Sequence, residues 1–106
     1  MAEQDIFNAL EKFVEEREWA QFHSVENLTK SISIESAELL ELSQWGQDIA
    51  LDKAADELAD VLTYCYLLAK KLNLSPESII LAKLEKNAMK YPVEKSKGVS
   101  TKYDKL

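Results

Sequence analysis

The stretch ESAELLELSQW, residues 35–45, decides the fold because it has the composition of a helix yet carries acids where a helix should be apolar. At about 100° per residue, Glu35 falls on one stripe with Leu39 and Leu42, and Glu38 lies at the edge of that stripe. A helix that packs through this stripe would turn two carboxylates towards its neighbour.

The stretch ELADVLTY, residues 57–64, repeats this arrangement further along the chain. Glu57 shares an apolar stripe with Tyr64, and Asp60 flanks that stripe. Carboxylates three residues apart are neighbours on a helix. Two helices therefore carry matching acid pairs on the faces through which they would pack against each other.

Four buried carboxylates require a cation, because an unpaired charge away from water costs several kcal/mol or forces protonation. The two stripes offer no suitable lysine or arginine apart from Lys53 and Lys71 at their edges. Magnesium binds carboxylate oxygens and completes its shell with water and substrate phosphates, so we expect Mg²⁺ here. A di-iron bundle would need Glu-x-x-His pairs, and the one histidine, His23, falls in a predicted loop. The remaining alternative is that the acids face solvent and bind nothing.

The composition favours a helical domain that acts away from nucleic acid and membranes. Only two Gly and two Pro interrupt 106 residues dominated by good helix formers. The formal net charge of −6 argues against a nucleic-acid partner. No stretch approaches the roughly 18 apolar residues of a membrane span, so we expect a cytoplasmic protein with no membrane partner.

Acidic and basic residues are segregated along the chain. Residues 1–60 hold 15 acids and 4 bases, whereas residues 61–106 hold 4 acids and 9 bases, all of them lysine. Such segregation arises on a solvated surface, or where an acidic site faces a lysine-rich one.

Apolar periodicity and helix-end residues predict four helices, at about 5–18, 24–45, 52–72 and 76–90. Asp5 and Ser24 are the expected N-caps of the first two. Gly46 is the left-handed residue expected to close the second helix, and Asn73 is the expected end of the third.

The end of the fourth helix, before Pro92, sets the predicted end of the domain. We expect an all-α four-helix domain over residues 1–92 and a polar, lysine-rich tail at 93–106 that is extended or mobile unless something holds it. A chain of this size cannot bury every apolar stripe, so the bundle should be completed by oligomerisation.

The acid pairs and their surroundings resemble a known family. Eighteen residues separate Glu35-x-x-Glu38 from Glu57-x-x-Asp60. Around them lie the stretches EEREWAQFHSVENL (15–28), LSQW (42–45), NAMKYP (87–92) and KYDKL (102–106). Together these resemble the all-α nucleoside triphosphate pyrophosphohydrolases of the MazG-like superfamily, in particular the dCTP pyrophosphatase branch.

The resemblance implies a four-helix MazG-like bundle that binds magnesium and splits a nucleoside triphosphate between its α and β phosphates. It implies that Glu35, Glu38, Glu57 and Asp60 hold the metal, with two ions per site when substrate is bound. A metal-activated water would attack, and Glu38 is our choice for the catalytic group that takes its proton. The resemblance also implies a homo-oligomer, and we expect a tetramer built as a dimer of dimers, or a dimer.

Candidate substrate residues follow from base stacking and phosphate charge. In resembling proteins, the loop that matches WAQFH and the tryptophan that matches Trp45 line the nucleoside pocket. The aromatic candidates on the base side are Trp19, Phe22, Trp45 and Tyr64, and core packing is the alternative for each of them. Gln21 and His23 belong to the same loop, and His23 would contact a phosphate or the sugar or else be a plain surface histidine. The phosphate-side candidates from the lysine-rich half are Lys83, Lys90 and Lys102. Asn87 would hydrogen-bond the substrate or only its own helix neighbours.

A small acidic helical chain could instead be an interaction module, antitoxin-like or adaptor-like, whose acids meet a basic partner helix. Such a module would need no metal and would turn nothing over. Acids within apolar stripes weigh against it, because a module of this kind would carry its charges on an outward face. The preferred base and sugar are left open by the sequence, with a dCTP-like deoxynucleotide as the expected substrate.

Overall fold

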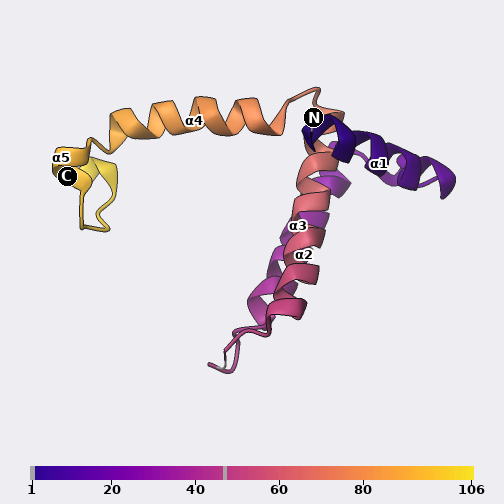
Figure 1. Ribbon diagram of the computed structural model, residues 1–106, viewed down its shortest axis with the longest axis horizontal. Coiled ribbons are helices and arrows are strands. Elements are labelled where there is room, and N and C mark those ends of the chain that lie inside the picture. The colour runs from indigo at the N-terminus through magenta and orange to yellow at the C-terminus, as the bar shows by residue number, and fades with distance from the viewer. Residues whose placement is uncertain (1, 47) are drawn as a thin grey trace. The chain divides into compact units, whose positions relative to one another are not determined.

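The computed structural model describes residues 2–46 and 48–106, and these residues form helices, turns and loops without a strand (Figure 1). The helices are α1 (Ala2–Glu16), α2 (Val25–Glu41), α3 (Leu51–Lys71), α4 (Pro76–Lys90) and α5 (Val93–Ser96), with short 3-10 helices η1 (Ala20–Phe22) and η2 (Tyr103–Lys105). The predicted all-α class is confirmed. The chain divides into two compact units, one reaching to Ser75 and one from Pro76 to Leu106.

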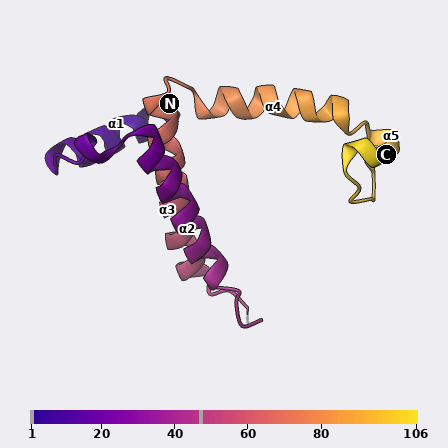
Figure 2. The ribbon, with the colours of Figure 1, turned by 180° about the vertical axis from the view of Figure 1, so that it is seen from behind.

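In the first unit, α2 and α3 form a pair of helices that run side by side in opposite directions. The pairing can be followed in both views of the ribbon, in Figure 1 and, seen from behind, in Figure 2. The small core of this unit lies near the start of α2, where Leu28 is 1% exposed, and near the end of α3, where Ala69 is buried. Val14 of α1 is the third buried apolar residue.

α1 packs against the C-terminal half of α3. The Phe7 ring lies 5.6 Å from the Tyr66 ring, measured between centroids. One turn further along each helix, the Lys70 ammonium group lies 3.1 Å from the Glu11 carboxylate. The expected N-cap at Asp5 is wrong, because α1 begins at Ala2 and Asp5 lies in its first turn, where a carboxylate stabilises the helix dipole.

The ends of α2 and α3 follow the sequence signals in part. The Ser24 side chain caps α2 by accepting a hydrogen bond of 3.1 Å from the Asn27 amide, as predicted. α2 ends at Glu41, not at Trp45, because the next residues form tighter turns and the Ser43 hydroxyl donates to a backbone carbonyl. Gly46 has a φ of 72° and so adopts the left-handed conformation expected of it, and Asn73, the expected end of the third helix, has a φ of 57° and is left-handed as well.

In the second unit, the segment after α4 is folded back on the end of that helix. The Tyr103 amide donates to the Tyr91 hydroxyl at 3.3 Å, and the two rings meet edge to face at 6.1 Å. The Lys90 ammonium group lies 4.8 Å from the centre of the Tyr103 ring. The tail therefore has local structure that its polar composition did not predict, while the boundary at residue 92 between domain and tail stays a prediction.

Several large apolar side chains stay exposed on these helices. Leu40 of α2 is 70% exposed, Leu51 of α3 86%, and Met89 of α4 84%. Within residues 2–46 and 48–106, no helix has both the length and the apolar character needed to cross a membrane.

Candidate metal and substrate site

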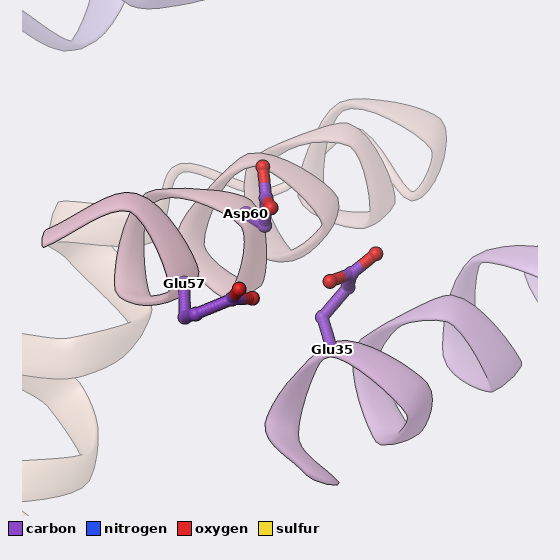
Figure 3. Close-up of side chains that lie close together, drawn as sticks. All are labelled: Glu35, Glu57 and Asp60. Atoms are coloured by element: carbon purple, nitrogen blue, oxygen red, sulfur yellow. The ribbon is translucent and has the colours of Figure 1, made fainter. Parts of the chain in front are cut away.

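Three carboxylates meet between α2 and α3. Glu35 extends from α2, and Glu57 and Asp60 extend from α3, so that the side chains converge (Figure 3). One oxygen from each lies within 4.8 Å of the others. The antiparallel pairing of the two helices thus brings together acids that lie far apart in the sequence.

Two of these carboxylates are partly removed from water, and one oxygen of each lacks a hydrogen-bond partner. Glu35 and Glu57 are half-buried, and each has one Oε2 atom that is buried without a hydrogen bond. The ion pairs found among residues 2–46 and 48–106 lie elsewhere, at Arg17–Glu16, Lys30–Glu26 and Lys70–Glu11. The alternative of acids that all face solvent is therefore wrong for Glu35 and Glu57, although Asp60 and Glu38 are exposed.

The pKa values of Glu35 and Glu57 are raised, so these two carboxyl groups hold their protons more tightly than usual. A hydrogen bond with Glu38, removal from water, and the charges of Glu38, Asp60 and Glu57 raise the pKa of Glu35 from 4.5 to about 7. Removal from water, and next the charge of Glu38, raise the pKa of Glu57 above its usual range. Both raised pKa values mean that the fully deprotonated cluster is disfavoured when no cation is bound.

Glu38 lies beside the cluster and outside its tight core. It touches both half-buried acids closely enough to raise their pKa values, but the group of oxygens within 4.8 Å of one another comprises only Glu35, Glu57 and Asp60. Its own side chain is exposed. Its roles as a metal ligand and as the proton acceptor stay predictions.

The residues present fit a hard divalent cation. The cluster supplies only carboxylate oxygens, which magnesium prefers, and its two orphaned buried oxygens are donor atoms that a cation would satisfy. No nitrogen or sulphur ligand joins this group in the described part of the chain, which fits magnesium better than zinc.

Two pockets lined by aromatic side chains border α3, and the lining of one of them includes an acid of the cluster. The first has a volume of about 370 Å³ and includes Asp60 in its lining. The second has a volume of about 320 Å³ and reaches Phe22. Both are lined by Trp19, His23 and Tyr64. An acid of the cluster and a flat aromatic surface therefore border the same space.

The loop that supplies these aromatics is fixed by hydrogen bonds to both flanking helices. The Trp19 amide donates to the Val14 carbonyl of α1 at 3.0 Å. At the other end, the Asn27 side-chain amide of α2 donates to the Phe22 carbonyl at 3.0 Å. The loop is held in shape without help from a ligand.

Several predicted substrate residues lie outside these pockets. The Gln21 side chain donates to the Glu18 carbonyl at 2.8 Å and so supports its own loop. Trp45 is 79% exposed in the turns after α2. The remaining candidates, Lys83, Asn87, Lys90 and Lys102, belong to the second unit.

Other residues line the pockets without having been predicted to do so. Leu10 and Phe13 of α1 and Thr63 of α3 border the first pocket, and Asn27 and Ser31 of α2 border the second. The spacing of Thr63, three residues after Asp60, places it next to the acid on the helix surface and is a signal that could have identified it. Leu10 and Phe13 follow the apolar period of α1 and cannot be told from core residues by spacing.

Comparison with known proteins agrees with this arrangement. Residues 30–106 match the model of the MazG-like family. The chain belongs to the MazG-like family. Similar proteins include dCTP pyrophosphatase 1 of Mus musculus and of Homo sapiens, each 34% identical over an alignment of 113 positions that covers 97% of this chain. This MazG-like chain spans 66% of the length of both relatives.

A crystal structure of a pyrophosphatase from Archaeoglobus fulgidus is similar in fold, with a TM-score of 0.82 and 34% sequence identity. The similarity covers 87% of this MazG-like chain and 94% of the archaeal one. The arrangement of helices described above is therefore shared with an experimentally determined member of the pyrophosphatases.

Proposed function

We propose that this MazG-like chain is a magnesium-dependent nucleoside triphosphate pyrophosphohydrolase that releases a nucleoside monophosphate and pyrophosphate. The observation that carries the proposal is the juxtaposition of the carboxylate cluster with pockets lined by Trp19, His23 and Tyr64. The similarity to dCTP pyrophosphatases and to an archaeal pyrophosphatase supports it.

The acids would divide the work between holding the metal and moving a proton. Glu35, Glu57 and Asp60 would hold magnesium, with Glu38 as a fourth ligand. Bound magnesium would lower the pKa of coordinated water and neutralise charge on the phosphate oxygens. Glu38 is the acid best suited to accept the proton of the attacking water, because its side chain is exposed and lies next to the half-buried pair.

The substrate would lie with its base against the aromatic side chains and its phosphates at the acids. Trp19, Phe22 and Tyr64 offer flat surfaces, and stacking on one such ring contributes roughly 1–3 kcal/mol. His23, which lines both pockets, would donate to the sugar or a phosphate. The relatives are named for dCTP, and a dCTP-like deoxynucleoside triphosphate is the substrate we propose.

The lysines of the second unit would bind phosphate oxygens of the triphosphate. Lys83, Lys90 and Lys102 are positively charged at neutral pH, and Asn87 lies three residues before Lys90. Trp45, exposed in the turns after α2, would join the base side when substrate binds.

Pyrophosphate release from a panel of canonical and modified triphosphates tests the proposal. We expect release with magnesium, none with a chelator, and the fastest turnover with cytosine deoxynucleotides. Glu57→Gln should reduce turnover at least about a hundredfold, whereas Glu41→Gln, on an exposed residue of α2 outside the cluster, should not change it. No release from any triphosphate in the presence of magnesium would reject the proposal.

The site of attack is tested separately by hydrolysis in oxygen-18 water. Attack on the α phosphorus leaves the heavy oxygen in the monophosphate. Label found only in pyrophosphate would show that water attacks the β phosphorus instead.

We also infer that copies of the chain associate, as a dimer of dimers or as a dimer. The first unit has only three buried apolar residues among those described, and the helices expose Leu40, Leu51 and Met89. Apolar surface of this extent is commonly covered by another subunit. Light scattering that gave a fully active monomer at micromolar concentration would exclude the association.

A further inference from the structure

Trp19, the tryptophan that lines both pockets, is braced by two residues that precede it in the sequence: Phe13 of α1, which also borders the first pocket, and Arg17, which borders neither. The Trp19 ring lies against the Phe13 ring, with centroids 5.7 Å apart and planes at 74°, an edge-to-face contact. The Arg17 guanidinium carbon in turn lies 3.8 Å from the centre of the Phe13 ring. The three side chains form a column of guanidinium, phenyl and indole groups.

A hydrogen bond also holds Arg17 in this column. Its Nη1 atom donates to the Phe13 carbonyl at 3.1 Å, which ties the guanidinium group to the same residue whose ring it covers. Its ion pair with Glu16 is long, at 4.0 Å, and both side chains are largely exposed, so that pair contributes little. A planar guanidinium group stacks on an aromatic ring as an ammonium group cannot.

The backbone fixes the position of Trp19 but does not fix the orientation of its indole ring. Glu18 has a φ of 55°, which turns the chain sharply between α1 and Trp19. The Trp19 amide is held by the Val14 carbonyl, but the residue as a whole is 45% exposed. Among the contacts described for residues 2–46 and 48–106, the Phe13 ring provides the aromatic partner that sets the orientation of the indole.

We propose that Phe13 and Arg17 are positioning residues for recognition of the nucleobase. Phe13 holds the Trp19 ring at the angle at which a base can stack on it, and Arg17 holds Phe13. Arg17 is absent from the lining of both pockets, so its effect on substrate passes through Phe13. The identity of the ligand as a base rests on the proposed function, whereas the bracing of Trp19 does not.

The mobility of the Trp19 ring tests the bracing without substrate. The chain has two tryptophans, and Trp45→Phe leaves Trp19 as the single fluorescent indole. In that background, Phe13→Leu and Arg17→Ala should lower the residual anisotropy of the nucleotide-free protein, and Arg17→Lys should lie between Arg17→Ala and the reference. Unchanged anisotropy in both Phe13→Leu and Arg17→Ala would overturn the proposal.

Two matched controls separate bracing from general effects. Phe7→Leu removes the other aromatic contact of α1, with Tyr66, and Lys12→Ala removes a positive charge from α1 without touching the column. Both should leave the anisotropy of Trp19 unchanged. A decrease in either control as large as in the column variants would also overturn the proposal.

Kinetics with Trp45 in place then test the role in recognition. Phe13→Leu should raise the KM for the nucleotide about threefold to tenfold, with kcat within about twofold of the parent. Arg17→Ala should raise KM about twofold to fivefold, and Lys12→Ala should not. If the Trp19 ring became more mobile while KM stayed unchanged, the role of Phe13 and Arg17 in recognition would be contradicted. A decrease in kcat alone would contradict it as well. If the parent hydrolyses no triphosphate, the proposed function fails while the anisotropy still decides the bracing.

Discussion

Replacing Glu35 by glutamine should change how the stability of the metal-free protein depends on pH. The pKa of this carboxyl group is raised from 4.5 to about 7, first by its hydrogen bond with Glu38 and then by removal from water. The folded state therefore holds the proton more tightly than the unfolded chain. Its contribution to the free energy of unfolding is complete below pH 4.5 and is lost as pH rises through about 7.

The size of the effect follows from the raised pKa and from the exposure of the site. A rise from 4.5 to about 7 sets an upper limit of about 3.4 kcal/mol, at about 1.4 kcal/mol for each pH unit. Because Glu35 is only half-buried, screening by water reduces this limit to about 1 kcal/mol. For a domain of this size that corresponds to a difference in melting temperature of about 4 °C.

The assay is thermal unfolding of chelator-treated protein at intervals from about pH 5 to about pH 8. Glu35→Gln should melt about 4 °C above the parent at the upper end, and this advantage should shrink to nothing at the lower end. Magnesium at the upper end should raise the melting temperature of the parent more than that of the variant, because the cation favours the deprotonated acids.

Glu41→Gln provides the control, since Glu41 is an exposed acid of the same helix outside the cluster. Its melting temperature should differ from that of the parent by a constant amount at every pH. If Glu35→Gln also differed from the parent by a constant amount, or if its advantage grew towards acid pH, the reasoning from crowded carboxylates would be refuted.

Three further substitutions test other parts of the structure. Asp60→Asn should reduce pyrophosphate release at least about a hundredfold without lowering the metal-free melting temperature, and a less stable protein with parental turnover would exclude a metal ligand at this position. Trp19→Ala should raise the KM for nucleotide by about tenfold through loss of stacking, and an unchanged KM would remove the base from this surface. Tyr91→Phe deletes the hydroxyl that accepts the Tyr103 amide, so hydrogen exchange at Tyr103 should accelerate relative to residues of α4; equal rates in variant and parent would contradict the fold-back of the tail.

The sequence was sufficient to predict the carboxylate cluster because helical periodicity is a local rule. The positions of Glu35 and Glu57 on apolar stripes, with Asp60 beside the second stripe, predicted that these acids would meet once the two helices paired, and they do meet. Glu38, the fourth predicted member, lies outside the tight group. Helix ends that depend on a single capping group, such as Ser24, could likewise be predicted from the sequence.

Features that depend on contacts between residues far apart in the sequence could not be predicted from it. The fold-back of the tail depends on Tyr91 and Tyr103, whose pairing across twelve residues has no periodic signature. Phe13 follows the same apolar period as a core residue, and only the structure shows that it borders a pocket. Gln21 lies within the motif that predicted a substrate contact, yet its amide is occupied by the Glu18 carbonyl.

The placement of the acids on two separate helices makes a shared cation a cross-link. Bound between Glu35 and Glu57, it would tie α2 to α3 across their connection, and it would stabilise the folded state because the unfolded chain holds no preformed site for it. Since magnesium completes its shell with substrate phosphates, this cross-link would be strongest while the nucleotide is present and would weaken when products leave. Proteolytic cleavage within residues 42–50 would then become slower as the site fills, and the rate of that cleavage would measure occupancy without any turnover.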